Sequence, residues 1–196
     1  MDVLRAASWV ILVLSWLACV GLLAWNHYRV RAERRRQGIP EEKPAIRDPR
    51  SMHGLLLEGI AFLILFTFRR SAVETAPWQY LASVLLAILS VVILAAALRH
   101  LDMEWRIKAV VTDDHQLVMT GPYRIVRHPI FAALVAQLLA SSLVLTQTWA
   151  AWLAIAVCLI GTEIRINAED GLLHRRFGKL YADYRMRTPA YLPFLR

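Results

Sequence analysis

The feature that most constrains this chain is a series of five apolar runs, over residues 6–25, 54–68, 78–98, 130–147 and 149–164. The first run holds twenty residues without a charge, and a helix of that length spans the hydrocarbon core of a bilayer at about 1.5 Å per residue. Hydrophobic residues make up 58% of the 196 positions. The pattern predicts an all-α integral membrane protein with about five transmembrane helices.

The first run could also be a cleavable signal peptide. Only Arg5 precedes it as a basic residue, however, and no small-residue cleavage site follows it. We therefore expect the run to remain as a membrane helix.

The basic residues predict the orientation of these helices. Lys and Arg number 8 in residues 26–52, 5 in residues 99–129 and 7 in residues 165–196. With five spans, an outer N-terminus and a cytoplasmic C-terminus, all three basic segments face the cytoplasm, as the positive-inside rule requires. We predict an integral membrane protein with membrane lipids as partners. Because this topology accounts for the net charge of +8, no nucleic-acid partner is predicted.

Several features of the apolar runs and their connections need interpretation. Glu58 interrupts the second run, either as an interfacial carboxylate, which we favour, or as part of a polar cavity.

Residues 99–120 are polar and read as an interfacial helix followed by a loop. Small residues recur every fourth position in the last two runs, which predicts that these two helices pack closely against each other: Ala132, Ala136 and Ala140, then Ala150, Ala154, Cys158 and Thr162.

Two polar blocks flank this predicted helical hairpin. The first is GPYRIVRHP at residues 121–129, in which Gly-Pro marks a turn and Pro129 suits the first turn of a helix. The second is Arg165-x-x-x-Glu169-Asp170, followed by FGxxYxxY at residues 177–184. An antiparallel hairpin brings the blocks together at one membrane surface. The alternatives are a basic stop-transfer flank for the first block and a simple i,i+4 ion pair between Arg165 and Glu169 for the second.

Together, GPYRIVRHP, the hairpin, RxxxED and FGxxYxxY resemble the isoprenylcysteine carboxyl methyltransferase family and its bacterial and phospholipid-methylating relatives. The resemblance extends from about Trp105 to the C-terminus. It divides the chain into residues 1–98, with three spans and a cytoplasmic loop over 26–53, and a methyltransferase core over 99–196. The resemblance implies that the loop, the hairpin and an amphipathic helical tail complete a cytoplasm-facing pocket for S-adenosylmethionine.

The chemistry of that cofactor suggests roles for the residues of both blocks. Glu169 or Asp170 accepts from its ammonium group, and His128 or a backbone N–H donates to its carboxylate. Tyr123 and Phe131 offer flat faces to adenine or to the sulfonium. The resemblance adds backbone contacts to adenine from the stretch His115, Gln116, Leu117 and Val118, and it places Arg127 and Pro129 in the same cofactor pocket. No metal site is predicted.

The acceptor is expected to be a lipophilic molecule that enters from the membrane. A carboxylate acceptor needs a cation rather than a base, and Arg165 can hold it bidentately. Arg165 and Glu169 are the predicted catalytic residues, since an amine or thiol acceptor would need Glu169 or His128 as a base. The chain has Phe131 where the family often has tyrosine, and Asp170 where it usually has a second glutamate.

Three alternatives remain open. The first is a methyltransferase that acts on a thiol or a phospholipid amine. The second is an NADPH-dependent membrane reductase of related architecture, with a 2′-phosphate site built from Arg175, Arg176 and Arg185. The third is a membrane protein without enzymatic activity, whose arginines only set its topology. The sequence leaves the oligomeric state undetermined.

Overall fold

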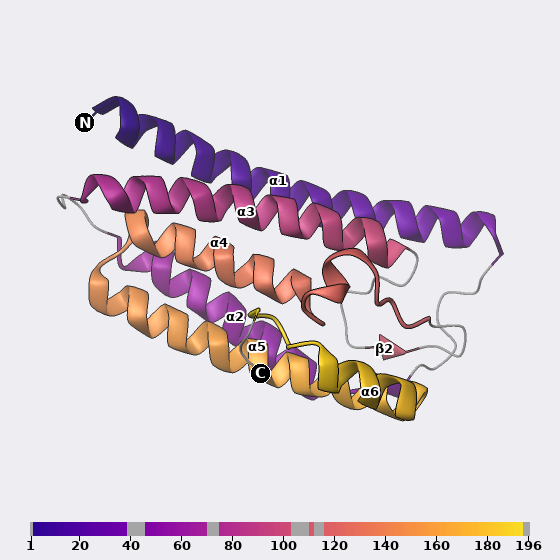
Figure 1. The fold of residues 1–196 in the computed structure, drawn as a ribbon. Helices are drawn as coiled ribbons and strands as arrows, with labels where there is room; N and C mark the ends of the chain where they lie inside the picture. The colour runs from indigo at the N-terminus through magenta and orange to yellow at the C-terminus, as the bar shows by residue number, and fades with distance from the viewer. Residues whose placement is uncertain (1, 39–45, 70–74, 103–109, 112–115, 194–196) are drawn as a thin grey trace.

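The computed structural model describes residues 2–38, 46–69, 75–102, 110–111 and 116–193, and in these it forms a bundle of helices (Figure 1). The helices are α1 (Asp2–Arg36), α2 (Arg50–Thr67), α3 (Pro77–Leu101), α4 (Pro129–Leu145), α5 (Thr148–Phe177) and α6 (Lys179–Arg187). A 3-10 turn, η2 (Gly121–Arg124), precedes α4. Strands β1 (Ile46–Arg47) and β2 (Val110–Val111) form a two-residue antiparallel pair. The predicted all-α membrane architecture is confirmed.

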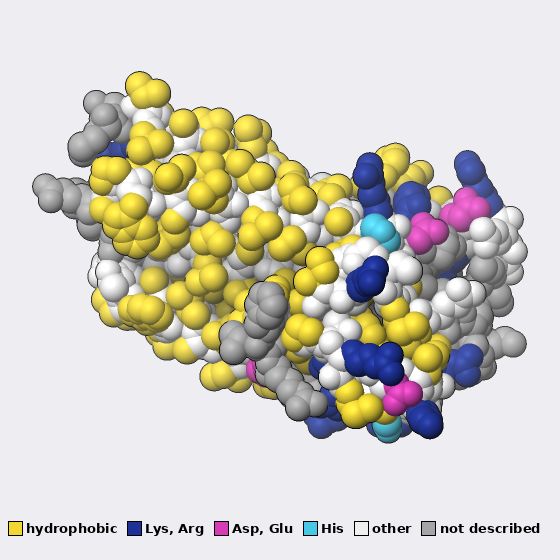
Figure 2. Space-filling model, in the orientation of Figure 1, with side chains coloured by type: hydrophobic (Ala, Val, Ile, Leu, Met, Phe, Trp, Pro, Cys, Tyr) yellow, Lys and Arg dark blue, Asp and Glu magenta, His cyan; other side chains and the backbone are white. Residues whose placement is uncertain are grey.

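Among the described residues, α1, α2, α3 and α5 are long and apolar enough to cross a membrane, and α4 is a shorter apolar helix of 17 residues. Their outward side chains are apolar along much of the bundle, with Leu17, Leu63 and Trp152 each more than 60% exposed. Figure 2 shows this apolar surface over most of one face, with charged side chains gathered at one end. The protein is therefore an integral membrane protein.

Two helices are much longer than predicted. Helix α1 continues to Arg36 because the predicted stop-transfer cluster is rich in arginine, which favours helix. Helix α5 continues to Phe177, so the second polar block lies on the same helix as the apolar run before it. It ends at Gly178, whose φ of +53° suits glycine.

The segment 99–120, predicted to be an interfacial helix followed by a loop, is described by the structure only in part. Arg99–Leu101 belong to α3, Val110–Val111 form β2, and residues 116–120 are not helical. Residues 103–109 and 112–115 of this segment lie outside the described part.

The two hairpin helices, predicted to pack closely against each other, do contact each other, but each packs more extensively against another helix. Helix α5 packs most extensively against α2, and α4 against α3. Ala154 and Cys158 of α5 lie in one apolar cluster with Ala61 and Leu65 of α2. On the other side, the hydroxyl of Ser83 in α3 donates to the carbonyl of Ala140 at 2.8 Å. The small residues do permit close packing, but with helices from the N-terminal half.

The closest approach between α2 and α5 is at two glycines. A Cβ added to Gly54 would lie 2.5 Å from the carbonyl oxygen of Gly161, and one added to Gly161 would lie 2.7 Å from that of Gly54. No side chain fits at either position without a shift of the backbone. This contact positions α2 beside the second polar block of α5.

The connections of the bundle lie at two opposite ends. At one end, the hydroxyl of Thr146 between α4 and α5 donates to the carbonyl of Phe68, and the amide of Gln147 donates to it at 3.2 Å. At the other end lie η2, α6 and the C-terminal half of α5 (Figure 1). The two polar blocks therefore share one end of the bundle, as the hairpin argument predicts.

Candidate active site

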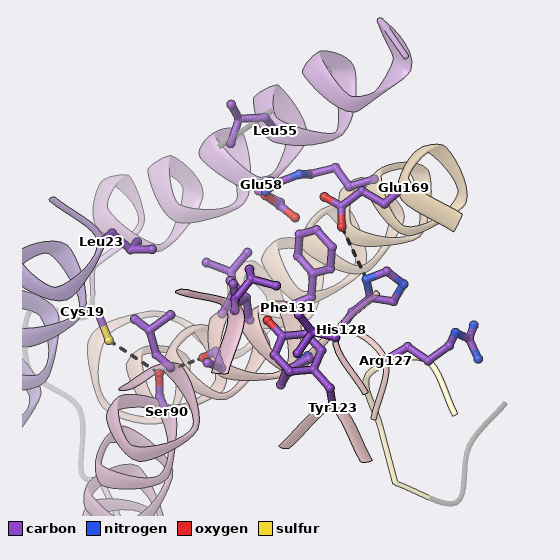
Figure 3. A pocket seen from close by; sticks show the side chains of 18 of the residues that line it. Cys19, Leu23, Leu55, Glu58, Ser90, Tyr123, Arg127, His128, Phe131 and Glu169 are labelled. Carbon is purple, nitrogen blue, oxygen red and sulfur yellow. Dashed lines mark hydrogen bonds and ion pairs between the residues drawn. The ribbon is translucent and has the colours of Figure 1, made fainter. Parts of the chain in front are cut away.

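A cavity of about 700 Å³ extends from the polar end of the bundle into its apolar part. Its polar wall is formed by the loop before α4 and by α5 and α6. Its apolar wall is formed by α1, with Cys19 and Leu23, and by α2, with Leu55 (Figure 3). The volume lies within the roughly 300–1,000 Å³ typical of small-molecule sites.

The first polar block reaches this cavity through a tight turn. Gly121 has a φ of +59°, and a Cβ there would lie 2.3 Å from Nε2 of His100 at the end of α3. Pro129 begins α4, and His128 before it takes an extended φ of −126°. This local geometry turns Tyr123, Arg127 and His128 inward, and all three are less than 10% exposed.

Asp170 is the centre of a buried polar network. Its Oδ1 lies 2.7 Å from Nε2 of His128 and accepts from the hydroxyl of Tyr181, and its Oδ2 accepts from Nη2 of Arg127 at 3.1 Å. Burial raises the pKa of Tyr181 above its ordinary range, so its hydroxyl keeps the proton that it donates. The network joins α5, α6 and the loop before α4 into one unit.

The residues after α6 fix the same loop through backbone contacts. The amide of Arg127 donates to the carbonyl of Pro189 at 2.9 Å, and the amide of His128 donates to that of Ala190 at 2.8 Å. The guanidinium of Arg127 donates to the carbonyls of Thr188 and Arg185. The C-terminal segment is thus a structural part of the site.

His128 lies between two carboxylates. Its Nε2 faces Asp170, and its Nδ1 lies 3.4 Å from Oε2 of Glu169 (Figure 3). Burial by itself lowers the pKa of the imidazole, but the hydrogen bonds to Asp170 and Glu169 outweigh it and raise the pKa above the ordinary 6.5. Glu169 is 28% exposed, which leaves its carboxylate accessible from the cavity.

Arg165 projects from α5 toward α2 rather than toward Glu169. Its Nη1 lies 2.6 Å from Oε2 of Glu58, and the other oxygen of Glu58 accepts from the hydroxyl of Thr162 at 3.2 Å. The guanidinium also stacks over the ring of Phe131 at 4.6 Å from its centroid. The i,i+4 pairing of Arg165 with Glu169 is therefore replaced by a pair between two helices. The preferred interpretation of Glu58 as an interfacial carboxylate is wrong, and its alternative, a polar cavity, is correct.

Most of the predicted site residues line the cavity. These are Arg165, Glu169, Gln116, Leu117, Val118, Tyr123, Arg127, His128, Pro129 and Phe131. Asp170 lies behind this wall with its oxygens engaged by protein groups, and His115 lies outside the described residues. One face of Phe131 is covered by Arg165 and both ring nitrogens of His128 face carboxylates, so neither group is as free as the sequence suggested.

Other residues of the cavity wall are absent from the predicted set. Tyr181 and Tyr184 line it, and the hydroxyl of Tyr184 donates to the carbonyl of Tyr123. The FGxxYxxY pattern was their signal. Gln137 of α4 is 2% exposed and also lines the cavity, and a polar side chain within an apolar run is the signal that could have identified it.

The fold and the cavity define a helical integral membrane protein with a polar site at one end of its bundle. Residues 83–175 match the model of the isoprenylcysteine carboxyl methyltransferase (ICMT) family, which confirms the resemblance predicted from the motifs. This part of the chain, which includes α4 and nearly all of α5, is therefore similar to that family of membrane methyltransferases.

A curated relative is the nickel-cobalt-cadmium resistance protein NccN of Alcaligenes xylosoxydans xylosoxydans. It is 38% identical over 81 residues, which cover 41% of this chain and 37% of the relative. The match thus spans a little over a third of the relative's length. Among the residues that the structure describes, no group of three or more His, Cys, Asp or Glu side chains is arranged to hold a metal ion.

Proposed function

We propose that this protein is an S-adenosylmethionine-dependent methyltransferase of a bacterial inner membrane. In this proposal it methylates a carboxylate on an isoprenylcysteine-like or other lipophilic acceptor. The observation that carries the proposal is the composition of the cavity: both polar blocks line one part of it, and apolar side chains of α1 and α2 line the rest.

The described residues fit the cofactor. Glu169 presents a partly exposed carboxylate that can accept from an ammonium group, and Gln116–Val118 line the same cavity. Tyr123 adds an aromatic ring that stays neutral, because burial raises the pKa of its hydroxyl above the ordinary range. Asp170 acts from behind, by holding His128 and Arg127 in place. When bound, the cofactor supplies an electrophilic methyl group on a positively charged sulfur.

The acceptor would reach Arg165 from the membrane. Val20 and Ala24 of α1 and Leu55 and Gly59 of α2 line the cavity and are exposed. Trp16 and Phe62 close the contact between the two helices further along, with ring centroids 4.9 Å apart. A lipophilic chain can therefore lie between α1 and α2 while its carboxylate meets the guanidinium. A carboxylate needs no base, so the residues only have to orient it and exclude water.

The distribution of positive charge supports a cytoplasmic site. The end of the bundle that carries the cavity also carries the arginines at the end of α1 and in α5 and α6 (Figure 2). By the positive-inside rule this end faces the cytoplasm, where S-adenosylmethionine is made available. A reporter fused after Arg196 should be active in the cytoplasm, and activity on the outer side would contradict the orientation.

The reductase alternative is less well supported. Its 2′-phosphate site would need Arg175, Arg176 and Arg185, and none of these three is on the described wall of the cavity. Arg185 instead lies 3.6 Å from Asp170. A thiol or amine acceptor remains the second candidate, because Glu169 is accessible and could take a proton.

The test is binding and turnover with detergent-purified protein. We expect calorimetry to detect S-adenosylmethionine binding, and Glu169→Ala and His128→Ala each to weaken it by about tenfold or more, the order of one lost hydrogen bond to a charged group. Arg34→Ala, in the basic end of α1, is the control and should bind normally. Equal effects of Arg34→Ala and Glu169→Ala would show that the site is misplaced.

The acceptor is tested with N-acetyl farnesylcysteine. A carboxylate acceptor predicts a rate that is nearly flat from neutral to alkaline pH. A thiol or amine predicts a rate that climbs with pH, and it would reject the carboxyl assignment while the methyltransferase assignment stands.

A further inference from the structure

Glu58 is a charged residue of the site that comes from outside the family match over residues 83–175. It lies on α2, is 3% exposed, and contacts Arg165 at 2.6 Å and Thr162 at 3.2 Å. A carboxylate and a guanidinium buried between membrane helices are costly unless each neutralises the other. The pair is therefore part of the site rather than a surface contact.

Arg165 is held on three sides. Gly54, one helical turn before Glu58, faces the stem of the arginine, since a Cβ there would lie 2.5 Å from its Cγ. Glu58 holds Nη1, and the ring of Phe131 lies under the guanidinium. The side chain remains 13% exposed and lines the cavity, while its Nε is buried without a hydrogen-bond partner among the described residues. The guanidinium is thus fixed in place with donors beyond the one that Glu58 uses.

We propose that Glu58 positions Arg165 and sets how strongly this arginine holds a carboxylate acceptor. The inference rests on the proposed function. With Glu58 in place, two carboxylates share one guanidinium, and their mutual repulsion weakens the hold on the acceptor. The acceptor oxygen keeps more of its electron density and remains nucleophilic. Once methylated, the acceptor is a neutral ester and has little attraction for a guanidinium already balanced by Glu58.

A purely structural ion pair makes a different prediction. If Glu58 only held α2 against α5, its loss would misplace Arg165, raise KM and lower kcat together. If Glu58 weakens the hold of Arg165 on the acceptor, neutralising Glu58 strengthens binding of the acceptor in the ground state without an equal gain in the transition state. KM and kcat then both fall.

The test is Glu58→Gln, which keeps the shape and an oxygen that can accept from Nη1 but removes the charge. With N-acetyl farnesylcysteine, we expect KM to fall by about tenfold, which corresponds to about 1.4 kcal/mol of like-charge repulsion relieved, and kcat to fall as well. Glu58→Asp keeps the charge but moves the carboxylate away from Arg165 by the length of one methylene. Its KM should therefore lie between the KM of the wild type and that of Glu58→Gln. Glu163→Gln, an exposed carboxylate of α5, is the matched control and should leave KM unchanged.

The outcomes separate this inference from the proposed function. Unaltered S-adenosylmethionine affinity and thermal midpoint in Glu58→Gln show that the variant is folded. Should the wild-type protein methylate a thiol or an amine but no carboxylate, the acceptor assignment and this inference both fail. Should it methylate the carboxylate while Glu58→Gln raises KM or leaves it unchanged, only the inference is overturned.

Discussion

Arg127 and Arg165 lie at the same end of the bundle, and their surroundings differ in kind. Arg127 uses its guanidinium on Asp170 and on the carbonyls of Thr188 and Arg185, and its side chain is 7% exposed. Among the described residues, Arg165 pairs with Glu58 and stacks on Phe131, and it stays open to the cavity. Arg127 joins the loop before α4, α5 and the C-terminal segment, whereas Arg165 keeps donors that a ligand can use. The same residue type thus stabilises the site in one place and is available for chemistry in the other.

The largest effect that tests this contrast is expected from Arg165→Ala. Loss of a charge-assisted, bidentate contact should lower methyl transfer to a carboxylate by roughly a hundredfold or more. S-adenosylmethionine affinity should change only a few-fold, because Glu169 and the loop remain. Combining it with Glu58→Gln avoids an unpaired buried carboxylate and keeps the comparison free of misfolding. A variant that methylates normally would remove Arg165 from the acceptor site.

Arg127→Ala should act on stability instead. It leaves Asp170 with one fewer cation and frees the carbonyls of Thr188 and Arg185, so we expect a loss of about 3 kcal/mol, in the range for breaking a buried ion pair. Arg124→Ala, an exposed arginine of the same loop, is the control and should cost little. Unfolding followed in detergent micelles measures both. Equal unfolding midpoints for the two variants would contradict the structural role of Arg127.

Gly54→Ala tests whether the close packing of α2 against α5 positions Arg165 in the cavity. The added methyl meets both the Cγ of Arg165 and the carbonyl of Gly161, so the helices must separate, at a cost of about 1–3 kcal/mol. Gly59→Ala on the same helix has no atom within 4 Å of its new Cβ and should be neutral or stabilising. If both substitutions left the unfolding midpoint unchanged, α2 and α5 would not pack as closely as described.

The contrast also shows what the sequence could predict. Helices, the turn at Gly121 and the meeting of the two polar blocks follow from local signals and from the short link between α4 and α5. The partner of Arg165 lies 107 positions away, and no local pattern connects the two residues. Small residues on α4 and α5 predict close packing, but not which helix supplies the partner. The chemistry of Asp170 suggests an acceptor for the ammonium group of the cofactor, and only the fold shows that protein groups engage its oxygens instead.

The smallest effect concerns His128, which shares Asp170 with Arg127. Because the folded-state pKa of His128 is raised above 6.5, its contribution to stability is complete below about pH 6.5 and is lost as the pH rises through the folded-state pKa. We expect the stability difference between wild type and His128→Gln to shrink on that rise, by at most about 1.4 kcal/mol per pH unit for one proton. Guanidinium groups stay protonated over this pH range, so the change of the stability difference with pH comes from the histidine. Asp170→Asn removes the main carboxylate that raises the pKa of His128. In a protein that carries Asp170→Asn, the stability difference caused by His128→Gln should therefore change less with pH. A stability difference that grows with pH would mean that the imidazole is held neutral between its two carboxylates. The charge of Asp170 would then be balanced by Arg127 and Arg185 without the histidine.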